Sequence, residues 1–436
     1  MGGDWTKALL GDICQLKAGG AFKKELQGNS HGELPFIKVS DMNLAGNELY
    51  IKNANNWVSK ETAKNIRAPI HPAGAVVFAK IGVALTYNRR RILTRDTLID
   101  NNMMSATPDA KHVDPRFFYY LLVNIDFNKI VEGSALPYLK ASTINSIDVL
   151  IPNISEQRAI AHILGTLDDK IELNRQMNRT LEAMAQALFK SWFIDFDPVV
   201  VNALRAGNPI PEKFAQRAVH YRDNPDALRL PGDALRQFPD RFQDSELGPI
   251  PEGWRVGIVS DLATIASGKR PKKRSKEKNV EFRIPLYGGG GIMAYVEEPL
   301  VTEPLLLTGR VGTLGKIFRI SEPCWPSDNT LILFPKKKIY FHFVFFMLQL
   351  IEFESLNRGS TQPLVTQMDL SNQSLVIPNA NVSNLFWVNV YSLFEKIDKS
   401  LEESSILSSL RDTLLPKLVS GELRVPDAEK LLEDAL

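Results

Sequence analysis

The most regular hydrophobic pattern in the chain runs from Glu156 to Ile194, where the seam positions alternate in steps of three and four. The stretch contains no proline and a single glycine, Gly165. Such spacing predicts a long helix whose apolar seam packs on a second helix. The apolar members of this seam are Leu164, Leu167, Ile171, Leu181 and Leu188, and its polar members are Asn174 and Asn178.

A second seam repeats the first at an offset of 226 residues. Its apolar members are Val390, Leu393, Ile397, Leu407 and Leu414, with Ser400 and Ser404 in the places of the two asparagines. A helix of about 39 residues extends about 58 Å at 1.5 Å per residue, which is typical of a spacer or an interaction rod. An ordinary long core helix is the alternative. Ser155 is the expected N-cap of the first helix.

The two seams belong to a duplication of nearly the whole chain. The segment Trp5–Ile13 matches Trp254–Leu262, and Gly133–Asn153 aligns without a gap to Gly359–Asn379. Since these anchors keep the same order in both halves, they indicate a repeated unit. A repeated unit predicts pseudo-two-fold symmetry, which would make the two helices an antiparallel coiled coil.

Short apolar runs before each helix predict strands. Ala75–Phe78, Pro304–Leu307 and Thr330–Phe334 are rich in Val, Leu, Ile and Phe, whereas Pro115–Ile125 has a helical pattern. We therefore predict an α+β fold, with two tandem α/β domains that each precede a long helix. The predicted parts are a domain at 1–154, a long helix at 155–194, a linker with short helices and no core of its own at 195–250, a second domain at 251–380, and a distal long helix with a tail at 381–436.

Composition places the chain among globular proteins of the cytoplasm. Hydrophobic residues make up 44% and charged residues 23%, close to globular averages. Cys14 and Cys324 lie far apart without a Cys/His cluster, which argues against a disulfide scaffold or a zinc site. The first residues lack the apolar stretch of a signal peptide, and the run Ile339–Ile351 is too short to cross a bilayer.

Catalytic signatures are missing from the sequence. The chain lacks the Asp/Asn-Pro-Pro-Tyr/Phe loop of amino-methyltransferases. The segment Gly309–Lys316 resembles a phosphate-binding P-loop, but Ile317 stands where a metal-coordinating hydroxyl is needed. Asp168 and Lys170 have the spacing of a nuclease core, yet a mid-helix position favours a solvated face. We predict no catalytic residue, no metal site and no cofactor for this chain.

The net charge of +2 hides an uneven distribution along the chain. Residues 1–154 and 251–380 each carry a net charge of +4, whereas 195–250 and 381–436 carry −2 and −4. Because cations that neutralise phosphates release counterions, two basic domains indicate nucleic-acid binding. The predicted DNA-binding residues are Lys23, Lys24, Lys80, Asn88, Arg89, Arg90, Arg91 and Lys140 in the first domain, and Lys269, Arg270, Lys272, Lys273, Arg274, Tyr287, Arg310, Lys316 and Arg358 in the second.

Several of these residues belong to distinctive loops. Lys269–Lys278 holds seven cations in ten residues, and a flexible loop without a partner is its alternative explanation. Lys80 and Arg310 stand at equivalent places in the repeat, each two residues before a glycine. Tyr287–Gly291 lets a backbone approach something closely, or forms a wide turn. The loops at Gly133-Ser134 and at Gly359-Ser360-Thr361-Gln362 offer small hydrogen-bond donors beside cations.

The sequence resembles the specificity (S) subunits of type I restriction-modification systems. The resemblance is most specific from Glu156 through Ile171 and from Leu181 to Pro198, which are similar to the central helical region of that family. Glu246–Trp254 is similar to the family's entry into a second recognition domain, and Leu415–Leu423 to its usual end. The resemblance covers the whole chain.

This resemblance implies a DNA sequence-specificity subunit without an active site. Each target recognition domain would recognise one half of a bipartite, asymmetric DNA site, and the helices would set the spacer and dock methyltransferase subunits. The implied partners are double-stranded DNA, two adenine-methyltransferase subunits and two motor-nuclease restriction subunits, with no membrane. S-adenosylmethionine, ATP and Mg would be used by those partners. A coiled-coil scaffold without sequence-specific DNA binding, and a nucleotide-processing enzyme that uses Gly309–Lys316, are the alternatives.

Overall fold

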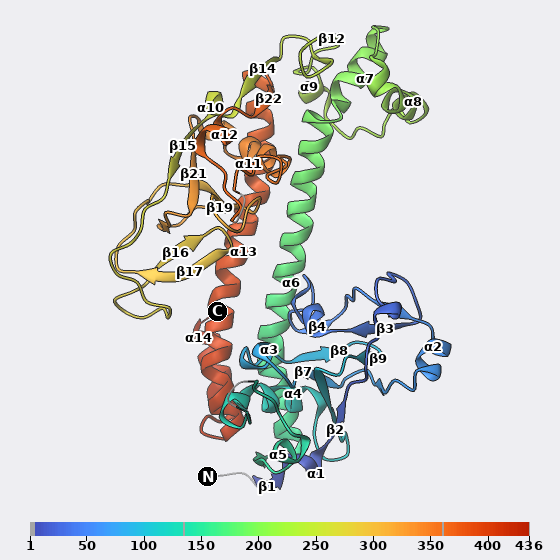
Figure 1. The fold of residues 1–436 in the computed structure, drawn as a ribbon, viewed down its shortest axis with the longest axis vertical. Coiled ribbons are helices and arrows are strands. Elements are labelled where there is room, and N and C mark those ends of the chain that lie inside the picture. The colour runs from blue at the N-terminus through green and yellow to red at the C-terminus, as the bar shows by residue number, and fades with distance from the viewer. Residues whose placement is uncertain (1–4, 134–135, 360–361, 436) are drawn as a thin grey trace. The chain divides into compact units, whose positions relative to one another are not determined.

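The protein is described by a computed structural model that covers residues 5–133, 136–359 and 362–435 (Figure 1). It divides into two compact units. The first unit comprises residues 1–179 and 397–436, and the second comprises residues 180–396. Two long helices, α6 (Ile154–Phe193) and α13 (Ala380–Ser420), each contribute one segment to each unit.

The first unit is a mixed α and β structure. A five-stranded sheet has the order β2-β10-β7-β8-β4, and a four-stranded sheet has the order β5-β3-β9-β6. Antiparallel pairing of β1 with β11 ties the N-terminal strand to the strand that leads into α6. The elements are β1 (Thr6–Leu9), α1 (Leu10–Ile13), β2 (Cys14–Ala18), β3 (Leu34–Ile37), β4 (Tyr50–Ile51), β5 (Trp57–Val58), α2 (Lys60–Asn65), β6 (Ile70–His71), β7 (Val76–Ala79), α3 (Val83–Thr86), β8 (Arg91–Leu93), β9 (Thr97–Ile99), β10 (Met103–Pro108), α4 (Pro115–Asn124), α5 (Ala141–Asn145), β11 (Asp148–Ile151) and α14 (Val425–Ala435).

Helix α4 supplies much of the core of the first unit. Its start follows from the sequence, because the Asp114 carboxylate accepts hydrogen bonds from the backbone N–H groups of Arg116 and Phe117, and Pro115 occupies the first turn. The six residues from Phe117 to Leu122 are all buried. They pack with the apolar faces of β7, β10 and α6 in one hydrophobic cluster.

The second unit repeats this plan. Its main sheet has the order β15-β21-β18-β19, which corresponds strand by strand to β2-β10-β7-β8, and β14 pairs with β22 as β1 pairs with β11. A separate sheet has the order β17-β16-β20. The elements are β14 (Arg255–Ile258), α10 (Val259–Leu262), β15 (Ala263–Ser267), β16 (Ile284–Gly288), β17 (Gly291–Val296), β18 (Leu305–Gly309), β19 (Ile317–Ile320), β20 (Trp325–Pro326), β21 (Thr330–Pro335), α11 (Phe341–Gln349), α12 (Gln367–Ser371) and β22 (Ser374–Ile377).

The duplication and the α+β fold class predicted from the sequence are thereby confirmed. The repeat anchors also mark equivalent close contacts. A Cβ atom on Gly19 would lie 2.0 Å from the carbonyl oxygen of Asp100, and one on Gly268 would lie 2.2 Å from that of Ser327. Both positions therefore require glycine, because a side chain would collide with backbone.

The long helices begin at equivalent asparagines. The Asn153 side chain accepts a hydrogen bond from the Glu156 N–H at 3.0 Å, and the Asn379 side chain accepts one from the Val382 N–H at 2.9 Å. The expectation that Ser155 caps the first helix was wrong, because Ser155 already lies inside α6. An asparagine side chain reaches its own helix N-terminus as well as serine does.

Within the first unit, α6 and α13 pair in antiparallel fashion. Asp168 contacts Arg411, whereas Asn174, further along α6, contacts Ser400 and Ser404, which come earlier in α13. The antiparallel pairing predicted from the seams is therefore confirmed. Asp168 does not lie on a solvated face, as the sequence had suggested: it is 6% exposed and bound to Arg411.

Within the second unit, aromatic side chains join the two helices to the domain. Phe189 and Phe193 of α6 lie with their ring centroids 5.9 and 4.9 Å from that of Phe386 of α13. Phe343 of α11 packs 4.9 Å from Phe193. Of the predicted seam positions, Leu164, Leu167, Ile171, Val390, Ile397, Leu407 and Leu414 are buried, and Leu181, Leu188 and Leu393 are half-buried.

The segment 195–250 contains short helices, as predicted, but it is more than a linker. Its helices are α7 (Asp197–Ala206), α8 (Ala215–Asp223) and α9 (Gly232–Leu235). Phe196, Phe214 and Phe238 are buried among aromatic neighbours, and the Arg217 guanidinium binds the buried Asp197 carboxylate at 2.7 Å. The segment therefore has a small packed core, contrary to the sequence-based expectation.

Two buried histidines predict a loss of stability in mild acid. Burial lowers the pKa of His71 to about 4 and that of His342 to about 3, aided by nearby Lys17 and Arg319 respectively. In the unfolded chain the histidine pKa is near 6.5. As the pH falls below this value, the unfolded chain therefore binds protons at these histidines that the folded chain does not bind. Stability should be complete above about pH 6.5 and decline by about 1.4 kcal/mol per pH unit for each histidine as the pH falls toward 4.

Urea unfolding between pH 7.5 and 4.5 measures this effect, and His342→Phe is the matched variant. His342 stacks on Phe394 at 4.4 Å between ring centroids, so a phenylalanine preserves the stacking and removes the titrating group. The variant should show a shallower pH dependence. An unchanged slope would contradict the assignment to His342.

Among the helices of the described residues, none combines the length and the apolar character of a segment that spans a bilayer.

Candidate nucleic-acid interface

The repeat places Lys80 and Arg310 in equivalent loops. The Lys80 N–H donates to the Asn102 carbonyl at 2.8 Å, and the Arg310 N–H donates to the Asn329 carbonyl at the same distance. The carbonyl oxygens of Lys80 and Arg310 accept hydrogen bonds from Leu139 and Val365, at 2.8 and 2.9 Å. Both backbones are thus fixed from two sides.

Each of these loops is held by a neighbouring loop, here named the clamp loop (residues 132–138 in the first unit and 358–364 in the second). The Gly82 N–H donates to the Pro137 carbonyl and the Gly312 N–H to the Pro363 carbonyl, at 2.8 and 3.1 Å. Gly82 and Gly312 both have φ of +81°, a backbone conformation that favours glycine. The equivalence of Lys80 and Arg310 inferred from sequence therefore holds in three dimensions.

Ion pairs of opposite polarity tie the clamp loops to the helix that follows. In the first unit Glu132 binds Lys140 at 2.6 Å, and in the second unit Arg358 binds Asp369. Glu132 and Arg358 are equivalent positions in the repeat. The Lys140 ammonium lowers the pKa of Glu132, and the Thr366 side chain, together with Arg358, lowers that of Asp369. Two of the predicted DNA-binding cations, Lys140 and Arg358, are therefore engaged in these pairs.

The side chains of Lys80 and Arg310 are left available for a partner. Both are half-buried, and neither forms an ion pair with any described residue. The Arg310 Nε is buried without a hydrogen-bond partner. A guanidinium can bind phosphate or the edge of a guanine, so an unused, fixed cation at the same place in both copies is suited to DNA.

The surroundings of the two cations differ. In the first unit Val83, Tyr87 and Leu136 are 70%, 61% and 58% exposed, and the Leu136 side chain lies against Gly82. In the second unit the places of Val83 and Leu136 are taken by the exposed polar residues Thr313 and Gln362. These exposed apolar residues were not predicted from the sequence, although apolar side chains beside loop glycines are a usable signal.

The cluster Asn88–Arg91 divides into two residues with structural contacts and two half-buried arginines. Asn88, with φ of +55°, accepts a hydrogen bond from the Phe127 N–H at 3.1 Å. Arg90 is 2% exposed, lies over the Phe127 ring and donates to the Ile125 carbonyl at 2.6 Å. Burial lowers the pKa of Arg90 to about 10, which leaves it charged at neutral pH. Asn88 and Arg90 therefore make contacts that hold the fold.

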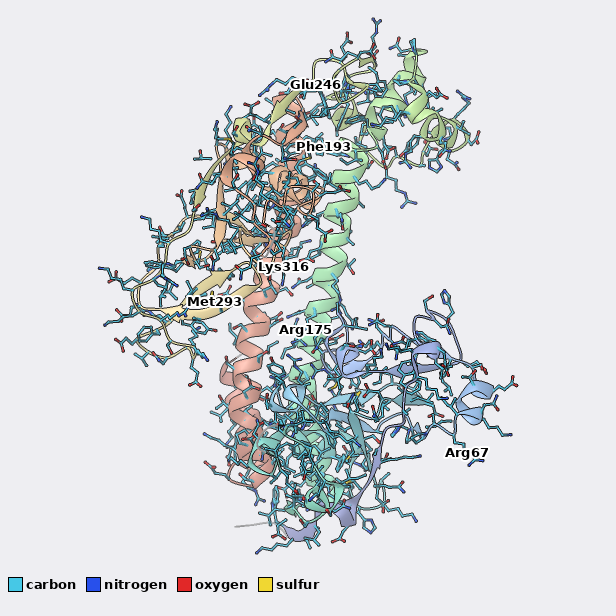
Figure 2. The ribbon with its side chains drawn as sticks, in the orientation of Figure 1. Arg67, Arg175, Phe193, Glu246, Met293 and Lys316 are labelled. Carbon is cyan, nitrogen blue, oxygen red and sulfur yellow. The ribbon has the colours of Figure 1, made fainter. Side chains whose placement is uncertain are left out.

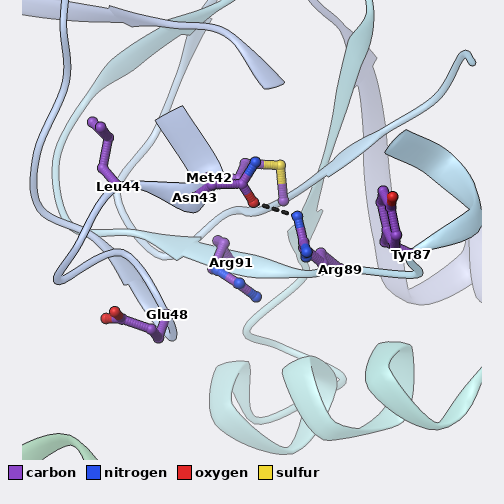
Figure 3. Close-up of a pocket in the computed structure, with 7 residues that line it drawn as sticks. All are labelled: Met42, Asn43, Leu44, Glu48, Tyr87, Arg89 and Arg91. Atoms are coloured by element: carbon purple, nitrogen blue, oxygen red, sulfur yellow. Dashed lines mark hydrogen bonds between the residues drawn. The ribbon is translucent and has the colours of Figure 1, made fainter. Parts of the chain in front are cut away.

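Arg89 and Arg91 line an open cavity of about 440 Å³ (Figure 3). Arg89 donates to the Asn43 side chain and lies 4.7 Å from the centroid of the Tyr87 ring. Arg91 has a buried Nε without a partner, and burial lowers its pKa. The cavity is also lined by Met42, Leu44 and Glu48.

The basic segment 269–278 runs beside β17 in the second unit. Ser275 and Tyr295 exchange backbone hydrogen bonds of 2.9 and 2.8 Å, so the segment extends the edge of that sheet. Arg270 lies 3.9 Å from Asp328 and Lys273 lies 3.4 Å from Glu297. The remaining cations that we predicted there, Lys269, Lys272 and Arg274, are exposed and form no ion pair within the described residues.

The glycine-rich turn Tyr287–Gly291 packs closely against another segment of the same chain. A Cβ on Gly289 would lie 2.6 Å from the Thr313 carbonyl oxygen, and Lys316 donates to the Gly290 carbonyl at 3.2 Å. Tyr287 is half-buried, with its ring 6.2 Å from that of Phe318. Met293, which projects from neighbouring β17, is 50% exposed (Figure 2).

The phosphate-binding alternative for Gly309–Lys316 is not supported. A P-loop connects a strand to a helix N-terminus, whereas this segment connects β18 to β19.

The other predicted site residues of the first unit include Lys23 and Lys24. Both are exposed, and Lys23 lies 3.6 Å from Glu25. The predicted donors Ser134, Ser360 and Thr361 lie outside the described residues. Within the described residues, no group of three His, Cys, Asp or Glu is placed to hold a metal ion.

These features define a class of protein with two unlike copies of a basic domain, each continued by a long helix. The family described as "Type I restriction modification DNA specificity domain" matches residues 2–183 and 251–403. The chain therefore belongs to this family. Both matched stretches coincide with the two copies of the repeat.

Relatives of full length support this membership. The chain is 26% identical to the type I restriction enzyme HindI specificity subunit of Haemophilus influenzae, over 96% of this chain and 100% of that protein. It is 24% identical to the MjaIX specificity subunit of Methanocaldococcus jannaschii, over 97% and 94%. A crystal structure of a type I restriction-modification S subunit from M. genitalium shares the fold, with a TM-score of 0.55, 17% identity and 96% of each chain covered.

Proposed function

We propose that this chain is the DNA sequence-specificity subunit of a type I restriction-modification complex. Residues 1–154 and 251–380 act as two target recognition domains, and each recognises one half of a bipartite DNA site. The observation that carries the proposal is the equivalent placement of Lys80 and Arg310, each fixed by its backbone and without an ion pair to any described residue.

The proposed site is asymmetric, because the two domains present different chemistry around the shared cation. Val83 and Leu136 offer apolar contacts of the kind that thymine methyl groups accept, whereas Thr313 and Gln362 offer hydrogen bonds. Two copies with different loops recognise different half-sites. A coiled-coil scaffold without DNA recognition would have no need for a repeated, unpaired cation.

The proposed subunit recognises DNA and leaves the chemistry to its partners. These partners are two adenine-methyltransferase subunits, docked on the paired helices, and two motor-nuclease restriction subunits. S-adenosylmethionine, ATP and Mg serve those subunits, and the chain itself uses no cofactor. This assignment is supported by family membership and by the names of the relatives.

Methylome sequencing tests the proposed function. A host that expresses this chain with its methyltransferase partner should carry adenine methylation at one bipartite motif that disappears when the chain is deleted. The double variant Lys80→Ala with Arg310→Ala should reduce methylation of that motif. Methylation that does not depend on the chain would refute the proposal.

Replacing the cations of 269–278 with alanine should weaken DNA binding broadly. Each lost phosphate contact reduces the slope of log K against log salt by about 0.9, because fewer counterions are released. The matched control replaces Lys336, Lys337 and Lys338, an exposed basic run of the same unit. Binding titrations at several salt concentrations should show a reduced slope for the first variant alone. An equal slope in wild type and variant would place 269–278 away from DNA.

A further inference from the structure

A buried polar cluster joins the two helices to the domain in the first unit. The Tyr120 hydroxyl of α4 donates to Asp168 Oδ2 at 2.8 Å, and Arg411 Nη1 of α13 donates to Asp168 Oδ1 at 2.7 Å. Tyr120 and Asp168 are 1% and 6% exposed. Each carboxylate oxygen of Asp168 is thus bound by one donor, and the charge is neutralised by an arginine from a distant part of the chain.

In the second unit the residues at the equivalent positions are apolar, although His342 stacks on Phe394 and Arg319 lies over its ring. The offset of 226 residues takes Tyr120 to Phe346 and Asp168 to Phe394, and it takes Ala185 of α6 to Arg411 of α13. Phe346 and Phe394 are 4% exposed, with ring centroids 6.1 Å apart, and Ala185 is fully buried. One helix junction is therefore charged and hydrogen-bonded, and its counterpart is aromatic.

These differences between the two copies determine which helices can pair. If the N-terminal half paired with another copy of itself in the same geometry, Ala185 would stand where Arg411 stands. Asp168 would then be buried without a cation. If the C-terminal half paired with itself, Arg411 would face Phe394 and keep only the carboxylate of Asp412, the next residue of its own helix, which it binds at 2.7 Å. A buried carboxylate that loses its cation is strongly unfavourable, so pairing of the N-terminal half with itself is disfavoured most. Pairing of the C-terminal half with itself loses the contact of Arg411 with Asp168 and keeps the one with Asp412.

We propose that Asp168 and Arg411 make the helix pairing selective for unlike halves of the chain. The surface of α6 that carries Asp168 fits the C-terminal segment of α13 and rejects a second copy of α6. An assembly of this chain therefore always combines one first-copy and one second-copy domain. This selectivity does not depend on DNA recognition, so it can be tested without DNA.

The test uses the full chain with a protease site inserted between Asp226 and Ala227, two exposed residues beyond α8. After cleavage, the fragments 1–226 and 227–436 are separated in denaturant, refolded together with distinguishable tags, and analysed by native mass spectrometry. We expect the ratio of the unlike pair (1–226 with 227–436) to the two like pairs to exceed the ratio given by random pairing by about tenfold or more. Statistical proportions of like and unlike pairs would overturn the proposal.

Two variants assign the selectivity to this cluster. The double variant Asp168→Leu with Arg411→Leu removes both charges, and its preference for the unlike pair should fall to near the statistical share. The control, Lys170→Gln with Glu403→Gln, removes an exposed pair of the same two helices, 3.3 Å apart, and should keep the preference. Full selectivity in the leucine variant would overturn the proposal.

A measurement on the intact chain guards against poor refolding of the fragments. Asp168→Arg and Arg411→Asp should each lower the urea midpoint of unfolding, and their combination should recover part of the loss. Recovery supports a selective pair. A combined variant as unstable as the sum of the two single changes would count against it.

Discussion

Arg411→Ala is expected to lower the free energy of unfolding of the first unit by about 3–5 kcal/mol, because it leaves the Asp168 carboxylate buried and unpaired. Although burial opposes it, the charge of Asp168 raises the pKa of Arg411, so the guanidinium is charged at neutral pH. The Asp168 side chain is 7% exposed and that of Arg411 is 26% exposed, so solvent offers the carboxylate little compensation. Urea unfolding at pH 7 measures the loss.

The matched comparison is the double variant Asp168→Leu with Arg411→Leu. Replacing both charges of a buried pair by apolar groups is often close to neutral, so this variant should be more stable than Arg411→Ala. Tyr120 then loses its acceptor, which costs about 1–3 kcal/mol for a buried hydroxyl. Equal stability of Arg411→Ala and wild type would show that water reaches Asp168 in solution.

Lengthening both long helices at equivalent points is expected to lengthen the gap in the methylated DNA motif without changing its half-sites. Four residues inserted after Gln176 in α6 and four after Glu402 in α13 add about 6 Å at 1.5 Å per residue. Base pairs rise about 3.4 Å along the duplex, so the gap should grow by about one or two base pairs. Methylome sequencing reads the new motif directly.

The design follows from the pairing of the helices in the structure. The seam residues of each helix are spaced three or four residues apart, and an insertion of four residues adds one further spacing of four. Such an insertion unwinds a coiled coil only locally. An insertion in α6 alone would displace its seam against α13, so that variant is the control and should lose activity or stability. An unchanged gap in the doubly lengthened chain would show that the helices do not set the spacing.

Much of the fold could be predicted because it depends on local pattern. The seams of α6 and α13 follow a period that any buried helix pair requires, and the repeat, at an offset of 230 residues in that part of the unit, identified the equivalence of Lys80 and Arg310. Asp168 was misjudged because its partner, Arg411, lies 243 residues away and at a position where the other copy has alanine. Burial that depends on so distant a residue leaves no local signal.

The basic site was predicted less well than the fold, for a related reason. A cationic side chain has the same local appearance whether it faces solvent, as Lys272 does, or is buried over an aromatic ring, as Arg90 is. Asn88 and Arg90 were grouped with Arg89 and Arg91 because they are adjacent in sequence. Only the turn at Asn88 and the contact with Phe127 separate them.

The opposite polarity of the ion pairs at the clamp loops restricts how such domains can be recombined. A clamp loop moved alone from the first unit to the second would place Glu132 against Asp369, and the reverse transfer would place Arg358 against Lys140. Both chimaeras would set like charges at a contact that natively holds opposite ones. An exchange of DNA specificity that moves the clamp loop together with the helix that follows it keeps opposite charges in contact, so a module boundary beyond Asp369 avoids this repulsion.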